Sequence, residues 1–321
     1  SILASGTSLR VASGAASLPG VTWASAVAAP RPTVASTSIE AATLTPIVLD
    51  FTAAPVFSSL VFSTANNGYD AIGLRGATLT SAANLPKRGA TVGVNPVSNV
   101  TYVMLGSLTI NSGGSLTVAP GVVIKPVAGY SILVNAGGNL TMNGTAAAGD
   151  TITVTSIHDD NFGSPGDTDN NGSIQAPNRG DWNQIVFAQG ATGSLQRCRI
   201  KFANNSGSAG AVQMTNNNIG ISNSLISDCG HGIALFGTSN PAISNVAINN
   251  CSSTPVLQSV AATPTITGMT FLANAITAIG LQGEDVTVNS ALHPQNVAGF
   301  TNLTYYIMNS YLHVLSGVTL T

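Results

Sequence analysis

Charged residues are scarce in this sequence. Asp, Glu, Lys and Arg make up 7% of the 321 residues, whereas a typical soluble protein has about 25%. The ten basic and twelve acidic residues give a net charge of −2, and no basic group is larger than Lys87-Arg88 or the alternating Arg197, Arg199 and Lys201. Because phosphate neutralisation requires a basic face, this composition argues against nucleic acid as a partner.

Cysteines and long apolar runs are also lacking. Three cysteines in a chain of this length do not make a disulfide framework. No apolar run reaches the roughly 18 residues that a membrane helix requires, so we expect no transmembrane segment. No signal-peptide pattern follows Ser1. We therefore expect the chain to be a mature product or a piece of a longer protein.

Gly, Ser, Thr, Asn and Ala fill the places that Lys and Glu usually take. Hydrophobic residues still make up 44% of the chain, so the composition is not that of a disordered protein. Helix surfaces are normally built from Lys, Glu, Arg and Gln, which are few here. The composition therefore favours a β-rich fold with many turns.

A long stretch of the sequence occurs twice. Residues 32–62 align without a gap to residues 241–271, and residues 99–117 align to 302–321. Between them AIGLRG, residues 71–76, returns as AIGLQG, residues 278–283. Residues 32–117 and 241–321 are therefore two copies of one stretch in a tandem repeat of about 207 residues. This divides the chain into residues 1–107, which end one repeat, 108–303, which form the next, and 304–321, which begin another.

A shorter period of 22–26 residues runs inside the long one. Ile221 recurs as Ile243 and Ile266, and Ile226 recurs as Ile248 and Phe271. Such a period, with short β-branched segments and Gly, Asn and Pro at the turns, is typical of a β-solenoid. Parallel pairing between coils would stack these residues into internal columns. The prediction is an all-β, right-handed parallel β-helix.

The stretch from residue 108 to 202 carries a family resemblance. LTVAPGVVIK, GGNLTMNGT and GDWNQIVF follow one another in this order. The chain resembles the right-handed parallel β-helix repeats of bacterial secreted and cell-surface proteins. The resemblance implies an extracellular, cell-surface or secreted location and an adhesin-like or structural role, and it does not imply an enzyme.

Acidic residues are concentrated in one segment, residues 158–181. Asp167, Asp169, Asn171 and the following Gly172 have the alternating oxygen ligands and the turn glycine of a Ca²⁺ loop. We predict that they bind Ca²⁺ and that Asp159 or Asp160 completes the ligand shell. The expected helices and the terminal Glu of an EF-hand are absent. The alternative is a solvated, Asn- and Asp-rich hairpin.

Three other residues also have two interpretations. Trp182 fits either a sugar-stacking platform or a cap at the corner where residues 158–181 rejoin the helix, and the second is favoured. Cys229 and Cys251 fall on adjacent coils and fit reduced core thiols, since direct neighbours in parallel strands suit a disulfide poorly.

Three functions are compatible with a β-helix. The favoured one is a non-enzymatic structural or adhesive segment that tandem repetition extends into a stalk, sheath or filament. The alternatives are a polysaccharide-degrading enzyme, which needs acids in a groove, and a carbohydrate-binding module, which needs exposed aromatic side chains. The expected partners are neighbouring copies or repeats, end to end or side by side, and cell-surface glycans. Neither end of the sequence resembles a solenoid cap, so we expect further coils or another chain to cover both.

Overall fold

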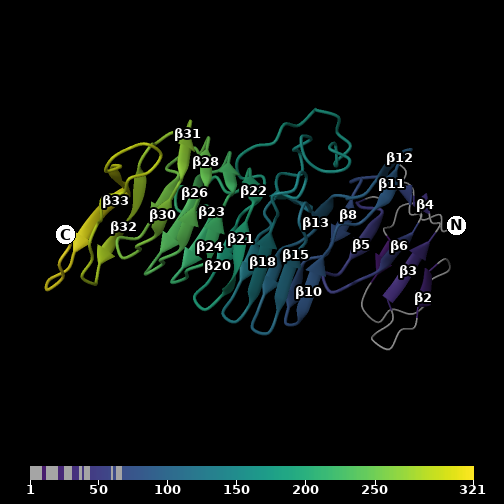
Figure 1. Ribbon diagram of the computed structural model, residues 1–321, viewed down its shortest axis with the longest axis horizontal. Coiled ribbons are helices and arrows are strands. Elements are labelled where there is room, and N and C mark those ends of the chain that lie inside the picture. Colours follow the sequence, from purple (N-terminus) through teal and green to yellow (C-terminus); the bar gives the residue numbers. More distant parts are fainter. Residues whose placement is uncertain are drawn as a thin grey trace.

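Stacked short strands form an elongated molecule with the first described strands and the C-terminus at opposite tips (Figure 1). The structure is a computed structural model that describes residues 9–11, 21–24, 31–35, 38–39, 44–58, 61–62 and 67–321. The expectation that the repeat continues back to Ser1 concerns residues 1–31, most of which lie outside these ranges. No helix with the length and hydropathy of a membrane span occurs in the described part of the chain.

Three long parallel sheets enclose the core. The ten-stranded sheet contains β1 (Leu9–Val11), β5 (Ile47–Leu49), β8 (Ile72–Leu74), β13 (Tyr102–Met104), β16 (Val123–Pro126), β19 (Ile152–Val154), β22 (Cys198–Lys201), β25 (Leu225–Ser227), β28 (Ala247–Asn249) and β31 (Thr270–Leu272). The nine-stranded sheet contains β9 (Ala77–Leu79), β14 (Leu108–Ile110), β17 (Ile132–Val134), β20 (Ile185–Phe187), β23 (Gly210–Thr215), β26 (His231–Phe236), β29 (Val256–Gln258), β32 (Ile279–Val286) and β33 (Tyr305–Val314). The seven-stranded sheet contains β10 (Ala82–Leu85), β15 (Ser115–Val118), β18 (Asn139–Asn143), β21 (Thr192–Gln196), β24 (Gly220–Ser222), β27 (Ala242–Ser244) and β30 (Thr265–Thr267).

Two smaller sheets complete the first coils. One contains β2 (Val21–Ala24), β3 (Arg31–Ala35) and β6 (Val56–Ser58). The other contains β4 (Ser38–Ile39), β7 (Val61–Phe62), β11 (Ala90–Val92) and β12 (Asn95–Val97). Among the described strands, only β2 with β3 and β11 with β12 pair antiparallel. The chain passes from the seven-stranded to the ten-stranded to the nine-stranded sheet and back, which is the predicted right-handed parallel β-helix.

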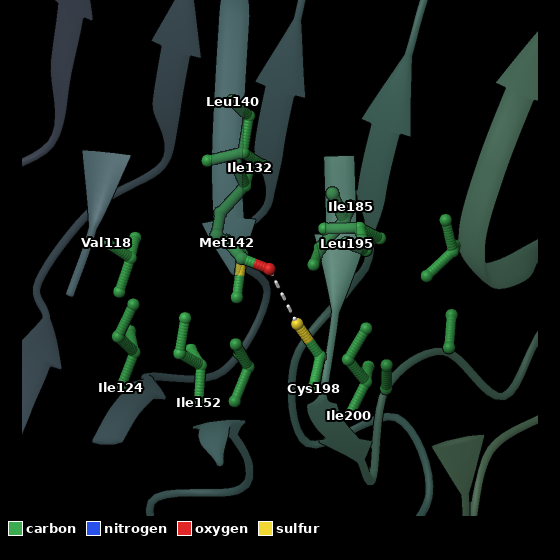
Figure 2. Packing of buried hydrophobic residues seen from close by; sticks show 14 of the residues in the cluster. Val118, Ile124, Ile132, Leu140, Met142, Ile152, Ile185, Leu195, Cys198 and Ile200 are labelled. Carbon is green, nitrogen blue, oxygen red and sulfur yellow. Dashed lines mark hydrogen bonds between the residues drawn. The ribbon is translucent and has the colours of Figure 1, made fainter. Parts of the chain in front are cut away.

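The predicted apolar columns lie inside the helix. Ile221 pairs in register with Ile243, and Ile243 with Ile266. Ile221 and Ile243 are fully buried, and Ile266 packs against the same core. Figure 2 shows the same arrangement a few coils earlier, where aliphatic side chains from the three sheets meet. Because each strand alternates inward and outward residues, the column keeps its alignment only at this spacing.

The three cysteines are free and buried, which confirms the core thiols predicted at Cys229 and Cys251. Cys198 lies among the aliphatic side chains of Figure 2, and its Sγ donates to the carbonyl oxygen of Met142 at 3.2 Å. Burial raises the pKa of the Cys198 and Cys251 thiols to about 12. These thiols therefore remain protonated at neutral pH and act as small apolar side chains.

Left-handed residues turn the corners on both sides of the ten-stranded sheet. The corner before this sheet uses Arg197, Asn223, Asn245 and Gly268, and the corner after it uses Phe202, Asp228, Asn250 and Ala273, all with positive φ. Asn and Asp tolerate this conformation because their side chains bond locally. Here they also bond between coils, since Asn250 Nδ2 donates to Asp228 Oδ1 at 2.5 Å.

Among the described coils, the length departs most from the predicted 22–26 residues at three places: one coil runs from Leu9 to its partner Ile47, and the other two carry insertions at corners of the helix. One of these two contains the β11–β12 hairpin before β13. Another runs from Val134 to its partner Phe187 and contains the acidic segment. Both insertions leave the register of the apolar columns unchanged, because they protrude from corners of the helix and not from its strands.

We predict that Ile243→Ala lowers the free energy of unfolding by about 2–5 kcal/mol, since it opens a cavity between two coils. Ile266→Ala should cost less, because Ile266 is only partly buried. The control is Thr265→Ala, an exposed position, which should change stability by no more than about 0.5 kcal/mol. Urea denaturation followed by circular dichroism measures all three. Equal losses at Thr265 and Ile243 would contradict this core assignment.

Candidate metal centre

The acidic segment forms a long loop between β19 and β20. It contains no strand between residues 155 and 184, so it is not the hairpin that one interpretation of the sequence suggested. Figure 1 shows it projecting from the middle of the helix and leaning towards β13 and β8. The segment 155–184 is called the Asp-rich loop below.

The Asp-rich loop is tied to coils that precede its own. The Asp70 amide, just before β8, donates to the Thr168 carbonyl at 2.8 Å. The Ser164 amide donates to Thr101 Oγ1, just before β13, at 2.8 Å. The loop therefore lies across several coils and has a defined position on the surface of the helix.

Lys125 holds the base of the Asp-rich loop. This strand β16 residue is fully buried, and its Nζ donates to the Asp159 carbonyl at 3.0 Å, the Gly166 carbonyl at 2.8 Å and Thr168 Oγ1 at 2.8 Å. Burial lowers the pKa of Lys125 to about 8, and the nearby carboxylates oppose this lowering. All three N–H groups of the ammonium thus find acceptors in the loop.

Sequence reasoning missed Lys125. It stands in the quoted motif LTVAPGVVIK but was not identified as a site residue. The available signal was a lone lysine inside an apolar strand of a charge-poor chain. Such a charge is buried only when it is paired or well hydrogen-bonded, so its presence indicated acceptors elsewhere in the fold.

Three of the predicted ligands come together above this lysine. Asp160, Asp167 and Asp169 each place one carboxylate oxygen within 4.8 Å of the others. Burial raises the pKa of Asp160, and repulsion from Asp167 and Asp169 raises it further. The charge of Lys125 offsets this repulsion only in part, so the cluster concentrates negative charge.

Unpaired oxygen atoms distinguish this cluster from an ordinary acidic surface. The Asp169 side chain is only 6% exposed. Its Oδ2 accepts from Asn171 Nδ2 at 2.6 Å and lies 2.6 Å from His158 Nδ1. Its Oδ1 is buried without a hydrogen-bond partner, as are Oδ1 of Asp160 and Oδ1 of Asn171. Each such buried acceptor costs about 1–3 kcal/mol unless a ligand satisfies it.

Asp167 shapes the turn that carries the other ligands. Its Oδ1 accepts from the Asn171 amide at 3.1 Å, and its Oδ2 accepts from the Gly172 amide at 3.0 Å. Asn170 and Gly172 both have positive φ, a conformation that glycine adopts without strain. The local sequence therefore determines a tight turn in which alternate side chains meet.

Asp159 has a separate role in the structure. Its carboxylate accepts from Thr155 Oγ1 at 2.5 Å and from Asn161 Nδ2 at 3.0 Å. Asp159 is fully buried, and it is not among the three grouped carboxylates. Of the five predicted ligands, the structure thus brings together Asp160, Asp167, Asp169 and Asn171.

The exit of the loop is closed by Trp182. This side chain is fully buried, and its Nε1 donates to the Lys201 carbonyl at 2.7 Å. Ser156 Oγ donates to Asp181 Oδ2 at 2.5 Å, joining the start of the loop to its end. Trp182 therefore caps the corner, as favoured from the sequence, and does not present a sugar-stacking face.

A cation–π contact fixes the outer side of the loop. The Arg199 guanidinium lies 4.4 Å from the centroid of the Phe162 ring, and Lys201 Nζ lies 5.5 Å from the same centroid. Both basic residues belong to β22, one coil beyond β19. The loop is thus held by coils on both sides.

We predict that Lys125→Met releases the Asp-rich loop, since it removes the three hydrogen bonds from β16 to the loop and a cation that attracts the carboxylates. Limited proteolysis should cut between residues 160 and 178 at least about tenfold faster than in the parent chain. Lys87→Met, which removes an exposed lysine paired with Asp150, is the control. Unchanged cleavage in Lys125→Met would contradict this role.

Comparison with known families agrees with the fold. A family model described as the right-handed beta helix region matches residues 169–306. Searches of curated proteins and of solved structures found no match. The matched region begins inside the Asp-rich loop and ends at the start of β33, and the structure continues the same coils on its N-terminal side. Residues 169–306 are thus similar to the right-handed β-helix family.

Proposed function

We propose that this chain is a non-enzymatic extracellular structural or adhesive protein. In this proposal it is a segment of a tandem-repeat β-helix that forms a stalk, sheath or filament at the cell surface. Neighbouring repeats or copies are its main partners, and cell-surface glycans are the ligands of an adhesive form. The observation that carries the proposal is the structural equivalence of the two repeat copies.

The two copies make the same strand pairings. In the first, Ile47 pairs with Ile72, and Ile72 pairs with Tyr102. In the second, the equivalent pairs are Val256 with Ile279 and Ile279 with Tyr305. Repetition thus preserves the residues that join one coil to the next. Adding such repeats lengthens the β-helix along its axis. A longer helix serves a structural role, which supports the proposal.

The placement of the acids supports this role over polysaccharide cleavage. Glycoside hydrolysis requires two carboxyl groups that flank a substrate. Here Asp159 is fully buried, Asp167 bonds the backbone of its own loop, and Asp169 is almost entirely covered. The hydrogen bonds of Asp159 and Asp167 are thus made within the loop, which supports a structural role for these carboxylates.

We further propose that Asp160, Asp167, Asp169 and Asn171 bind Ca²⁺. Hard cations prefer several oxygen ligands, and the three buried, unpaired Oδ1 atoms are of this kind. Extracellular Ca²⁺ modules have dissociation constants of about 10⁻⁴–10⁻³ M, so a loop of this kind fills outside the cell. Bound Ca²⁺ would neutralise the cluster and stiffen the Asp-rich loop.

We expect millimolar Ca²⁺ to protect the Asp-rich loop from proteolysis and to raise the melting temperature, because the ion binds only the folded loop. Asp169→Asn should abolish both effects. Asp285→Asn, which changes an exposed carboxylate near His313, should retain them. Differential scanning calorimetry with and without a chelator measures the shift. A parent chain indifferent to Ca²⁺, or an equal response of the Asp169→Asn variant, would refute the site.

The structural role itself predicts an elongated particle without turnover. Small-angle scattering should give a rod-shaped profile, and a panel of neutral and acidic polysaccharides should release no new reducing ends or unsaturated products. Asp160→Asn should leave both results unchanged. Polysaccharide cleavage that disappears in Asp160→Asn would replace this proposal with the enzymatic alternative.

A further inference from the structure

Strand β33 presents an open edge at the C-terminal tip of the helix. It pairs with β32 on one side and is the outermost described strand of the nine-stranded sheet, as Figure 1 shows at the yellow end. Large apolar side chains lie exposed on it: Tyr306 is 48% exposed, Ile307 47% and Tyr311 56%. An unpaired edge combined with exposed apolar groups is a surface on which another strand can add.

The equivalent strand of the first copy is covered. Tyr102 of β13 pairs with Ile72 on one side and with Ile124 of β16 on the other. The three residues of β13 are almost completely buried. Tyr305 of β33 pairs with Ile279 as Tyr102 pairs with Ile72. Both strands thus pair with an equivalent strand on their inner side. Among the described residues, only β13 also has a partner strand on its outer side.

We propose that the outer edge of β33 is the docking surface for a parallel strand with the sequence type of residues 122–126, VVIKP. A following repeat of the same polypeptide would supply it, with the residue equivalent to Ile124 opposite Tyr305. This rests on the proposed tandem array and names the strand that joins its repeats. The first copy identifies the strand that would dock on β33, because there β16 pairs with β13, the equivalent of β33.

One repeat does not contain a whole number of coils, so the second copy is offset from the first by one sheet. In the first copy β5, β8 and β13 lie in the ten-stranded sheet, whereas their equivalents β29, β32 and β33 lie in the nine-stranded sheet. Successive repeats therefore occupy the three faces in rotation. It follows that the Asp-rich loop of the next repeat projects from a different face and not in line with the present one.

Glycines occupy the equivalent corner position in both copies. Gly76 and Gly106 lie against each other at the corner after β8 and β13, where a Cβ on Gly106 would be 2.7 Å from the Gly76 Cα. Gly283 is the equivalent of Gly76. The register between β32 and β33 shifts between Gln282 and Glu284, that is, at Gly283. A bulge re-aims a strand, so the same position bends in both copies.

The test is an extended chain, residues 1–321 followed by a second copy of residues 118–240. Hydrogen exchange read by mass spectrometry should show amides of residues 305–314 exchanging at least about tenfold more slowly than in the parent chain. A matched extension carrying Ile124→Pro in the appended copy removes a backbone donor, and protection of residues 305–314 should be lost. The original Ile124 stays unchanged in both.

Exchange in β26 serves as the internal standard for folding of the helix. A shorter appendix, residues 118–157, repeats the measurement in case the longer one does not fold. Unchanged exchange of residues 305–314 in both extended chains, with β26 still protected, would overturn the docking surface. Rod shape and lack of turnover are measured on the parent chain, so the structural role would stand. Protection of β33 by a soluble neutral polysaccharide, and not by the extensions, would assign the surface to glycans and also overturn the proposal.

Discussion

In-register stacking of parallel strands is the constraint on which this structure depends. Each residue lies directly beside its equivalent one coil away, so a position has one environment along the whole helix. An inward column must be apolar throughout, as at Ile221, Ile243 and Ile266. A corner must accept positive φ in successive coils, as at Asn223 and Asn245. Periodicity in the sequence is the consequence of this geometry.

Insertions are tolerated because they leave that stacking intact. The Asp-rich loop departs after β19 and returns before β20, and Val134 and Phe187 still pair. Five of the twelve acidic residues lie in the loop, and Lys125 of β16 opposes their charge. The helix thus supplies a rigid, nearly neutral base, and the loop carries the chemistry that we propose for metal binding.

The fold was predictable from the sequence because its period is visible there, and the column of Ile243 was predicted residue by residue. The grouping of Asp160, Asp167 and Asp169 followed from their clustering in a charge-poor chain. The position of Asp159 was not predictable. Its carboxylate accepts from Thr155, and this contact depends on the path that the chain takes as it leaves β19. Lys125 was missed for the same reason: its acceptors come from a segment that folds back onto an earlier coil.

The backward course of the Asp-rich loop has a mechanical consequence. A parallel β-helix pulled along its axis loses terminal coils one after another, because each coil contacts only its neighbours. The loop leaves the coil of β19 but bonds to Lys125 in β16 and to residues just before β13 and β8. These four coils therefore share the contacts of one loop in addition to their backbone ladder, and we expect them to separate under tension as a single unit.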